Sequence, residues 1–158
     1  MTDAVRGLDD LDVTAKQRAC DKLMELWDWR AKDPDHPPAS KELSAFCWWF
    51  IKDTFEEGWA LGCLANALEG GAELELDGHV LKKLRSLASS HTWNVLRCVE
   101  AIAVDERNRS WGIYLDEVEG ILRSSLNSTK AADREKAREL IHTIGSQGFF
   151  SLRELLTE

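Results

Sequence analysis

Hydrophobic residues recur at helical spacing through most of this chain. Apolar positions separated by three and four residues lie along one face of an α-helix. The pattern predicts seven helices and a short final one. Their apolar faces are Cys20, Leu23, Met24 and Trp27; Leu43, Phe46, Cys47, Phe50 and Ile51; Trp59, Leu61, Leu64, Ala65 and Leu68; Val80, Leu81, Leu84, Leu87 and Ala88; Val95, Val99, Ile102 and Ala103; Leu115, Val118, Leu122 and Leu126; Ala137, Leu140, Ile141 and Ile144; and Phe149, Leu152, Leu155 and Leu156.

Residues that favour helix ends lie between these faces. Thr14, with Gln17 three residues later, has the spacing of a capping box. Short polar side chains accept hydrogen bonds from the first turn of a helix, and glycines favour its end. The predicted starts are Thr14, Ser40 and Asp77, and the predicted ends are Gly70-Gly71 and Gly145. Residues 73–78 alternate as a strand would, but no second alternating run exists to pair with them, so we interpret them as a connecting loop.

The spacing of the helix starts predicts an architecture. Predicted starts near Ser40, Asp77 and Tyr114 are 37 residues apart each time (77 − 40 and 114 − 77), and each interval holds two helices. A period of about 40 residues with two helices per unit is typical of a HEAT-like α-solenoid, in which stacked hairpins bury a continuous core. We therefore predict an all-α fold of stacked antiparallel hairpins, with an irregular helical bundle as the alternative.

Length and proline positions predict the domain organisation. The chain has 158 residues, and its three prolines all lie within residues 33–38. We predict an acidic, flexible N-terminus over residues 1–13 and a single all-α domain over residues 14–158, with a proline-rich linker at 33–38.

The negative charge is concentrated in the first half of the chain. Residues 1–79 contain 8 Lys/Arg against 17 Asp/Glu, and residues 80–158 contain 12 against 11. Acidic surfaces repel phosphate backbones, so nucleic acid is not the expected partner. No apolar run is long enough to span a membrane, and the first twenty residues contain no signal-peptide core. The four cysteines are irregularly spaced and lie in apolar patterns, which indicates free thiols in a reducing, cytoplasmic compartment.

From Ser40 onward the order of these signals resembles the helical C-terminal tails of large bacterial multidomain proteins. The resemblance covers about three quarters of the chain. It rests on the order of short, mostly hydrophobic motifs: Glu42-Leu43, Phe46-Cys-Trp-Trp-Phe50, Phe55, Trp59-Ala-Leu61, Trp111, Ile121-Leu122, Arg134 with Ala137, Ile144-Gly-Ser-Gln-Gly148 and Leu155-Leu156. Such tails are mostly uncharacterised, and some belong to proteins of anti-phage or conflict-type systems. The resemblance implies a helical repeat without chemistry of its own.

Motifs that would indicate catalysis are missing from the sequence. None of the four histidines pairs with another His or Cys at zinc-ligand spacing, and neither phosphate-binding glycine motif is present. Acidic pairs such as Glu56-Glu57 are adjacent, so in a helix they point in different directions and share no proton or metal. We therefore expect no enzyme activity, no cofactor and no metal site.

Tryptophan and arginine positions indicate where a partner would bind, because these residues most often anchor interfaces. Five candidates stand out: Trp48 and Trp49, of which at least one must face away from the filled apolar stripe of its helix, and Arg107, Arg109 and Trp111 in and after a charged connection. Trp27, Trp59 and Trp93 are predicted to be core residues. The expected function is a non-catalytic helical-repeat module that binds another protein. The alternative is an acidic immunity or inhibitor protein that neutralises a basic effector, and a third hypothesis is an enzyme with a cleft that no motif announces.

Overall fold

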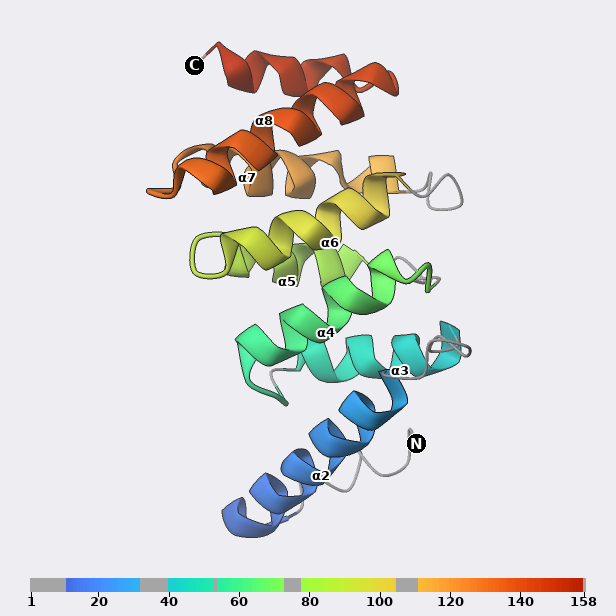
Figure 1. Ribbon diagram of the computed structural model, residues 1–158. Helices are drawn as coiled ribbons and strands as arrows, with labels where there is room; N and C mark the ends of the chain where they lie inside the picture. The colour runs from blue at the N-terminus through green and yellow to red at the C-terminus, as the bar shows by residue number, and fades with distance from the viewer. Residues whose placement is uncertain (1–10, 32–39, 53, 73–77, 105–110, 158) are drawn as a thin grey trace. The chain divides into compact units, whose positions relative to one another are not determined.

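The computed structural model describes residues 11–31, 40–52, 54–72, 78–104 and 111–157 of the chain (Figure 1). These residues form helices and contain no strand, so the predicted all-α class is confirmed. The helices are α2 (Val13–Ala31), α3 (Ser40–Ile51), α4 (Glu57–Glu69), α5 (Gly78–Leu87), α6 (Thr92–Val104), α7 (Leu115–Leu126), α8 (Ala131–Ser146) and the 3₁₀ helix η2 (Phe150–Leu156). They divide into two compact units, unit 1 (Met1–Glu75) and unit 2 (Leu76–Glu158).

Unit 1 contains α2, α3 and α4, and two of these helices are capped by acidic side chains. Oδ1 of Asp12 accepts hydrogen bonds from the backbone N–H groups of Thr14 and Ala15 at 2.9 and 3.0 Å. The prediction that Thr14 caps this helix was wrong by two residues, because a carboxylate is the stronger acceptor at a helix N-terminus. Similarly, Glu56 accepts from the N–H groups of Gly58 and Trp59 at the start of α4.

Aromatic rings from all three helices form the core of unit 1. Phe46 of α3 is fully buried, and its ring stacks on Trp27 of α2 with centroids 4.4 Å apart. Phe55 and Trp59 lie 6.4 and 5.9 Å from the same ring. Trp49 packs edge-on against Phe55 at 5.4 Å. Rings at these separations attract one another beyond the area that they bury, so this cluster holds α2, α3 and α4 together.

Unit 2 contains α5, α6, α7, α8 and η2, and each of these helices packs on the next one or two along the chain. Helix α5 packs on α6 and α7, α6 on α7 and α8, and α8 on α7 and η2 (Figure 1). The starts of α5 and α7 lie close together, since a Cβ atom at Gly78 would come within 2.4 Å of the Tyr114 ring. Near the middle of α6 and α8, Lys136 donates a hydrogen bond to Glu100.

Aliphatic side chains fill the core of unit 2. Its fully buried large side chains include Leu81, Leu84, Leu96, Ile102, Ile121, Leu122, Leu140, Ile141 and Ile144. Helix η2 adds Leu152 and Leu155, both buried, at the end of the chain. Two rings join this core at one point, where Trp111 packs on Phe149 with centroids 4.5 Å apart.

The helix boundaries agree with most of the predicted ones. Helices α3, α5 and α7 begin at residues 40, 78 and 115, which gives spacings of 38 and 37 residues. Gly71 has the positive φ (82°) that favours glycine after the end of α4. Residues 73–77 of the predicted connecting loop, including Asp77, and the linker at 33–38 lie outside the described residues. Gly78, the last residue of that predicted loop, instead begins α5. The single domain over residues 14–158 stays a prediction.

Candidate functional site

Trp111 is not available to a partner, and this corrects the sequence analysis. Its side chain is only 3% exposed and lies against Phe149, which precedes η2. The charged residues before it suggested an open loop, but the ring turns into the core of unit 2. Arg107 and Arg109, predicted beside it, lie outside the described residues.

Trp48 and Trp49 of α3 face opposite ways, as predicted for at least one of the pair. Trp49 is 2% exposed and belongs to the ring cluster of unit 1, so its candidacy as a partner-binding residue is withdrawn. Trp48 is 59% exposed. The Lys52 ammonium lies 6.0 Å from the centroid of its indole ring, at the outer limit of a cation–π contact. Among the predicted partner-binding residues that the structure describes, Trp48 therefore is the one with an exposed ring.

Two further tryptophans are exposed that the sequence analysis did not propose as binding residues. Trp29 of α2 is 74% exposed, and Trp93 of α6, predicted to be core, is 48% exposed. The sequence contained a signal for both exposed positions, because each tryptophan lies two residues from a buried residue: Trp29 from Trp27, and Trp93 from Val95. Residues two apart in a helix point to opposite sides. Trp48 has the same relation to the buried Phe46.

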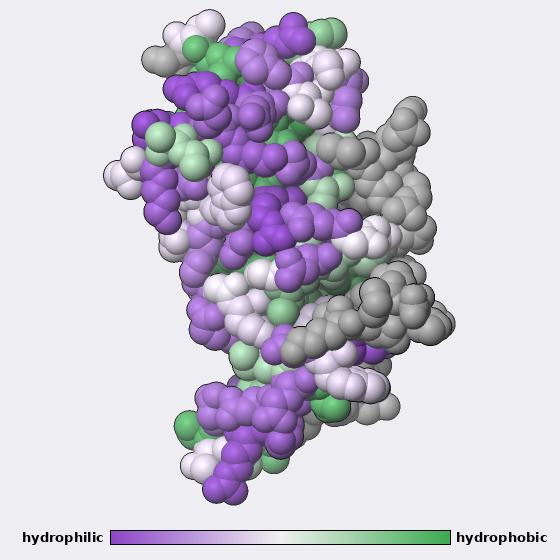
Figure 2. All heavy atoms as spheres, in the orientation of Figure 1, coloured by the Kyte–Doolittle hydropathy of each residue, from purple (hydrophilic) through white to green (hydrophobic). Residues whose placement is uncertain are grey.

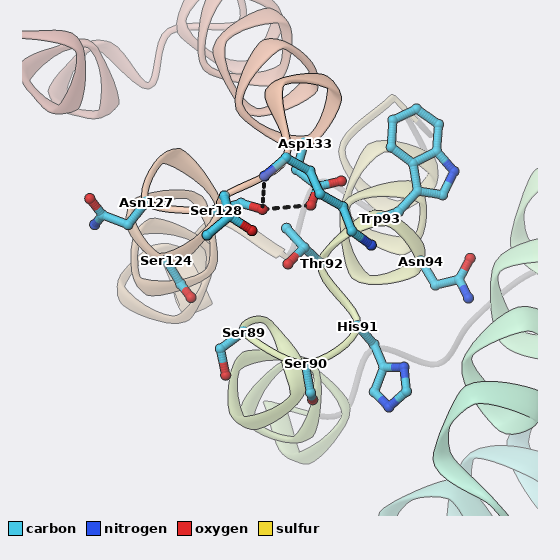
Figure 3. Close-up of a pocket in the computed structure, with 12 residues that line it drawn as sticks. Ser89, Ser90, His91, Thr92, Trp93, Asn94, Ser124, Asn127, Ser128 and Asp133 are labelled. Atoms are coloured by element: carbon cyan, nitrogen blue, oxygen red, sulfur yellow. Dashed lines mark hydrogen bonds between the residues drawn. The ribbon is translucent and has the colours of Figure 1, made fainter.

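A polar groove lies between two connections in unit 2. One wall is formed by Ser89, Ser90 and His91 of the α5–α6 connection and by Thr92, Trp93 and Asn94 of α6. The other wall is formed by Ser124 of α7, residues 127–130 of the α7–α8 connection and Asp133 of α8. Its volume is about 650 Å³. Figure 3 shows the serines of the first connection on one side and those of the second on the other. Apart from His91 and Trp93, its lining residues carry hydroxyl, amide or charged side chains.

Ser128 and Asp133 fix the shape of this groove. The Ser128 hydroxyl donates a 2.7 Å hydrogen bond to Oδ2 of Asp133, which is only 4% exposed. The same hydroxyl oxygen accepts from the backbone N–H of Lys130 at 3.2 Å (Figure 3). The guanidinium of Arg134 donates to the Ser128 carbonyl at 2.7 Å. On the other wall, Thr92 donates to the Ala88 carbonyl at 2.8 Å. Both turns are thus held rigidly by local hydrogen bonds.

The groove does not assemble a catalytic set from its described residues. In Figure 3 the His91 ring points away from the Ser128–Asp133 pair. General acid–base chemistry needs the base within hydrogen-bond reach of the group that it serves. The Asp133 carboxylate accepts the hydrogen bond of the Ser128 hydroxyl.

Two of the described cysteines, Cys20 and Cys63, are held as thiols. Burial, and after it the nearby Asp28 charge, raise the pKa of Cys63 to about 12. Burial also raises the pKa of Cys20, whose thiol donates to the Thr54 carbonyl at 3.5 Å. Since the thiolate is the nucleophilic and metal-binding form, neither residue has the properties of a reactive cysteine. Within the described ranges, no three His, Cys, Asp or Glu side chains come together as metal ligands would.

Comparison with known proteins gives no relative. No family model matches this chain, and neither a curated protein nor a solved structure is significantly similar to it. Among the helices described, none has the length and apolar character required to cross a bilayer.

Proposed function

We propose that this chain is a non-catalytic helical-repeat module that binds another protein. One observation carries the proposal. The apolar faces of the helices are mostly buried, whereas the side chains of Trp29, Trp48 and Trp93 are 74%, 59% and 48% exposed. Exposed indoles lose the free energy that burial gives elsewhere in the molecule. Tryptophan is enriched among the few interface residues that contribute most of a binding free energy.

The proposed architecture within this function is a HEAT-like stack of hairpins. Its support is strongest in unit 2, where α5 packs on α7 and α6 packs on α8. Equivalent contacts recur one period apart in sequence: Gly78 meets Tyr114 (114 − 78 = 36), and Glu100 meets Lys136, also 36 residues apart. In a repeat protein the connections between helices lie along one edge. A partner can contact the variable side chains there without disturbing the core.

The test is to identify the partner by cross-linking and mass spectrometry and then to measure Kd for substituted chains. Trp48→Ala or Trp93→Ala is expected to weaken binding at least tenfold, which corresponds to about 1.4 kcal/mol. Phe150→Ala is the matched control, because Phe150 is also an exposed ring (64%) but lies under the Arg153 guanidinium. Circular dichroism confirms that each variant is folded. If neither tryptophan matters, or if no protein partner exists, the proposal is wrong.

The charge distribution favours a second candidate, an inhibitor of a basic effector. Unit 1 contains 8 Lys/Arg against 16 Asp/Glu, a net charge of −8, whereas unit 2 contains 12 of each. A one-sided charge steers an oppositely charged partner and accelerates association. For an inhibitor, the association rate constant should fall steeply between about 50 and about 500 mM salt. A rate constant that does not change with salt would argue against the inhibitor and for the interaction module.

We also propose a reducing, cytoplasmic location in a bacterial system. Its support is the four cysteines, none of which forms a disulfide, together with the sequence resemblance to bacterial helical tails. Protein isolated from its native cells without reductant should titrate four thiols after denaturation. Two or more missing thiols would contradict this location.

A further inference from the structure

We propose that the polar groove of unit 2 binds an extended, uncharged peptide segment of the partner, whose main chain crosses from the α5–α6 connection to the α7–α8 connection. This inference rests on the proposed function, because it names the part of the partner that this site would recognise.

The groove offers hydrogen-bonding groups that the fold itself does not use. In the part of the chain that the structure describes, the hydroxyls of Ser89, Ser124 and Thr129 have no hydrogen-bond partner, although these residues line the groove. Asn127 uses its amide N–H to cap the Arg123 carbonyl at 3.0 Å and keeps its amide oxygen available. A peptide main chain alternates N–H donors with carbonyl acceptors, and hydroxyls serve as both.

The charges of the groove favour a neutral ligand. Among the residues that line the groove, the carboxylate belongs to the buried Asp133, and Ser128 already donates a hydrogen bond to one of its oxygens. Lys130 is exposed and formally balances this carboxylate. An anionic ligand would therefore meet Asp133, and a cationic ligand would meet Lys130. A peptide backbone avoids both penalties, because it is recognised by hydrogen bonds rather than by ion pairing.

The size of the groove fits a short stretch of extended chain. Packed helices lie about 8–10 Å apart, and an extended residue advances about 3.3 Å, so roughly three residues bridge two neighbouring connections. The volume of about 650 Å³ lies within the range of ligand pockets, about 300–1,000 Å³. Trp93 lines the same groove with a half-exposed ring, which gives one apolar side chain of the peptide a surface to pack on.

The experiment uses the full chain and a display library of random 12-residue peptides as the probe. Enriched peptides are synthesised, and their Kd is measured by fluorescence polarisation. Ser89→Tyr places a large ring in the groove from an exposed position and is expected to weaken binding at least tenfold. Ser86→Tyr is the matched control: it makes the same change at an exposed position of α5 that does not line the groove, and it should leave Kd unchanged.

Backbone amide spectra locate the bound peptide independently of these variants. The peptide should shift the resonances of residues 89–94 and 124–130 and leave those of α2 and α3 in place. An absence of enriched peptides, binding that Ser89→Tyr does not affect, or shifts confined to other residues would each overturn the inference. Enrichment of oligosaccharides from a parallel glycan array, without peptides, would also overturn it. The proposed function survives such a failure if the cross-linked partner still loses affinity with Trp48→Ala.

Discussion

The two units of this chain are both helical, but they are held together by different chemistry. Unit 1 joins three helices through a cluster of five rings, Trp27, Phe46, Trp49, Phe55 and Trp59. In unit 2, leucine and isoleucine side chains fill the core between the helices, and glycines allow side chains from neighbouring helices to approach closely. A ring cluster concentrates the cohesion of a unit in a few residues, whereas aliphatic layers distribute it over many.

The surfaces of the two units differ in charge. Unit 1 exposes Leu26, Trp29 and Trp48 and carries the net negative charge. Unit 2 exposes Trp93, Ile113 and Phe150, has no net charge and presents a polar groove. On the face of unit 2 visible in Figure 2, hydrophilic residues predominate and hydrophobic ones form small separate areas. Under the proposed function, the charge of unit 1 would steer a partner, and the groove of unit 2 would contact the partner's main chain.

The largest effect is expected from Phe46→Ala, which removes the ring that contacts three others. Replacing a buried phenylalanine by alanine costs about 3–5 kcal/mol of unfolding free energy. Urea unfolding measures the loss, and Phe46→Leu, which keeps most of the volume, should lose clearly less. A cost below about 1 kcal/mol would mean that cohesion in unit 1 is not concentrated in this ring.

A single aliphatic position in unit 2 should cost somewhat less. Leu84 of α5 is fully buried, so Leu84→Ala is expected to lower the unfolding free energy by about 2–5 kcal/mol, with the exact value set by how far its neighbours can close the cavity. If the layers distribute cohesion as we infer, this cost lies at the lower end of that range. Equal costs for Leu84→Ala and Phe46→Ala would remove the contrast between the units.

Two glycines of unit 2 test whether close approach is required. A Cβ at Gly78 would lie 2.4 Å from Cε1 of the half-buried Tyr114 ring, so Gly78→Ala is expected to cost about 1–3 kcal/mol. At Gly120 the obstacle is the flexible Arg85 side chain, which is half exposed, and alanine is the better helix former. Gly120→Ala should therefore be neutral or slightly stabilising in the same thermal unfolding assay. Similar losses at both positions would contradict this distinction.

The cap of α2 should contribute less than the core positions of either unit. Removing the Asp12 carboxylate in Asp12→Ala leaves the N–H groups of Thr14 and Ala15 without their acceptor, at a cost of about 0.5–2 kcal/mol. Thr14→Ala is the control and should cost much less, since its hydroxyl is not the cap. The reverse order in a chemical unfolding series would restore Thr14 as the cap.

At neutral pH the smallest effect concerns Cys63 of unit 1, because its contribution to stability changes only at alkaline pH. Its folded pKa, about 12, lies above the ordinary value of 9.0, so the folded state keeps the thiol proton that the unfolded state releases. The resulting stabilisation is fully present below pH 9 and is lost as the pH rises from 9 toward 12. Alkylation by iodoacetamide should accordingly be slow at pH 8 in the folded chain and fast in urea. Equal rates would show that the thiol is not protected.

Helical faces were predictable from this sequence because burial imposes a period that simple spacing reveals. Leu84, Val99 and Ile141 were assigned to the core from their spacing alone, and all three are buried. Tertiary packing was less accessible. Trp111 follows a charged stretch, which favours exposure, but its ring is buried by Phe149 from 38 residues later in the chain (149 − 111). No local pattern contains that contact.

The candidate site was predictable only in part. Trp48 emerged because its helix had no room for it on the apolar face. Trp93 was assigned to the core, since a tryptophan in a helical stretch usually packs, although its position two residues before the buried Val95 indicated the opposite side. The groove itself gave no signal, because it forms where two polar connections meet in space, and serine-rich turns look alike in sequence whether or not they adjoin.

The contacts between residues about 36 positions apart have a consequence for how unit 2 folds. Gly78 with Tyr114 and Glu100 with Lys136 join neighbouring hairpins, so the loops that close during folding are short and of similar length. Chains whose contacts are local in sequence fold in microseconds to milliseconds, because little loop entropy is lost before each contact forms. In the proposed stack each hairpin would serve as the template for the next, and a hydrogen-exchange experiment on the folded protein should then show protection that declines hairpin by hairpin toward η2.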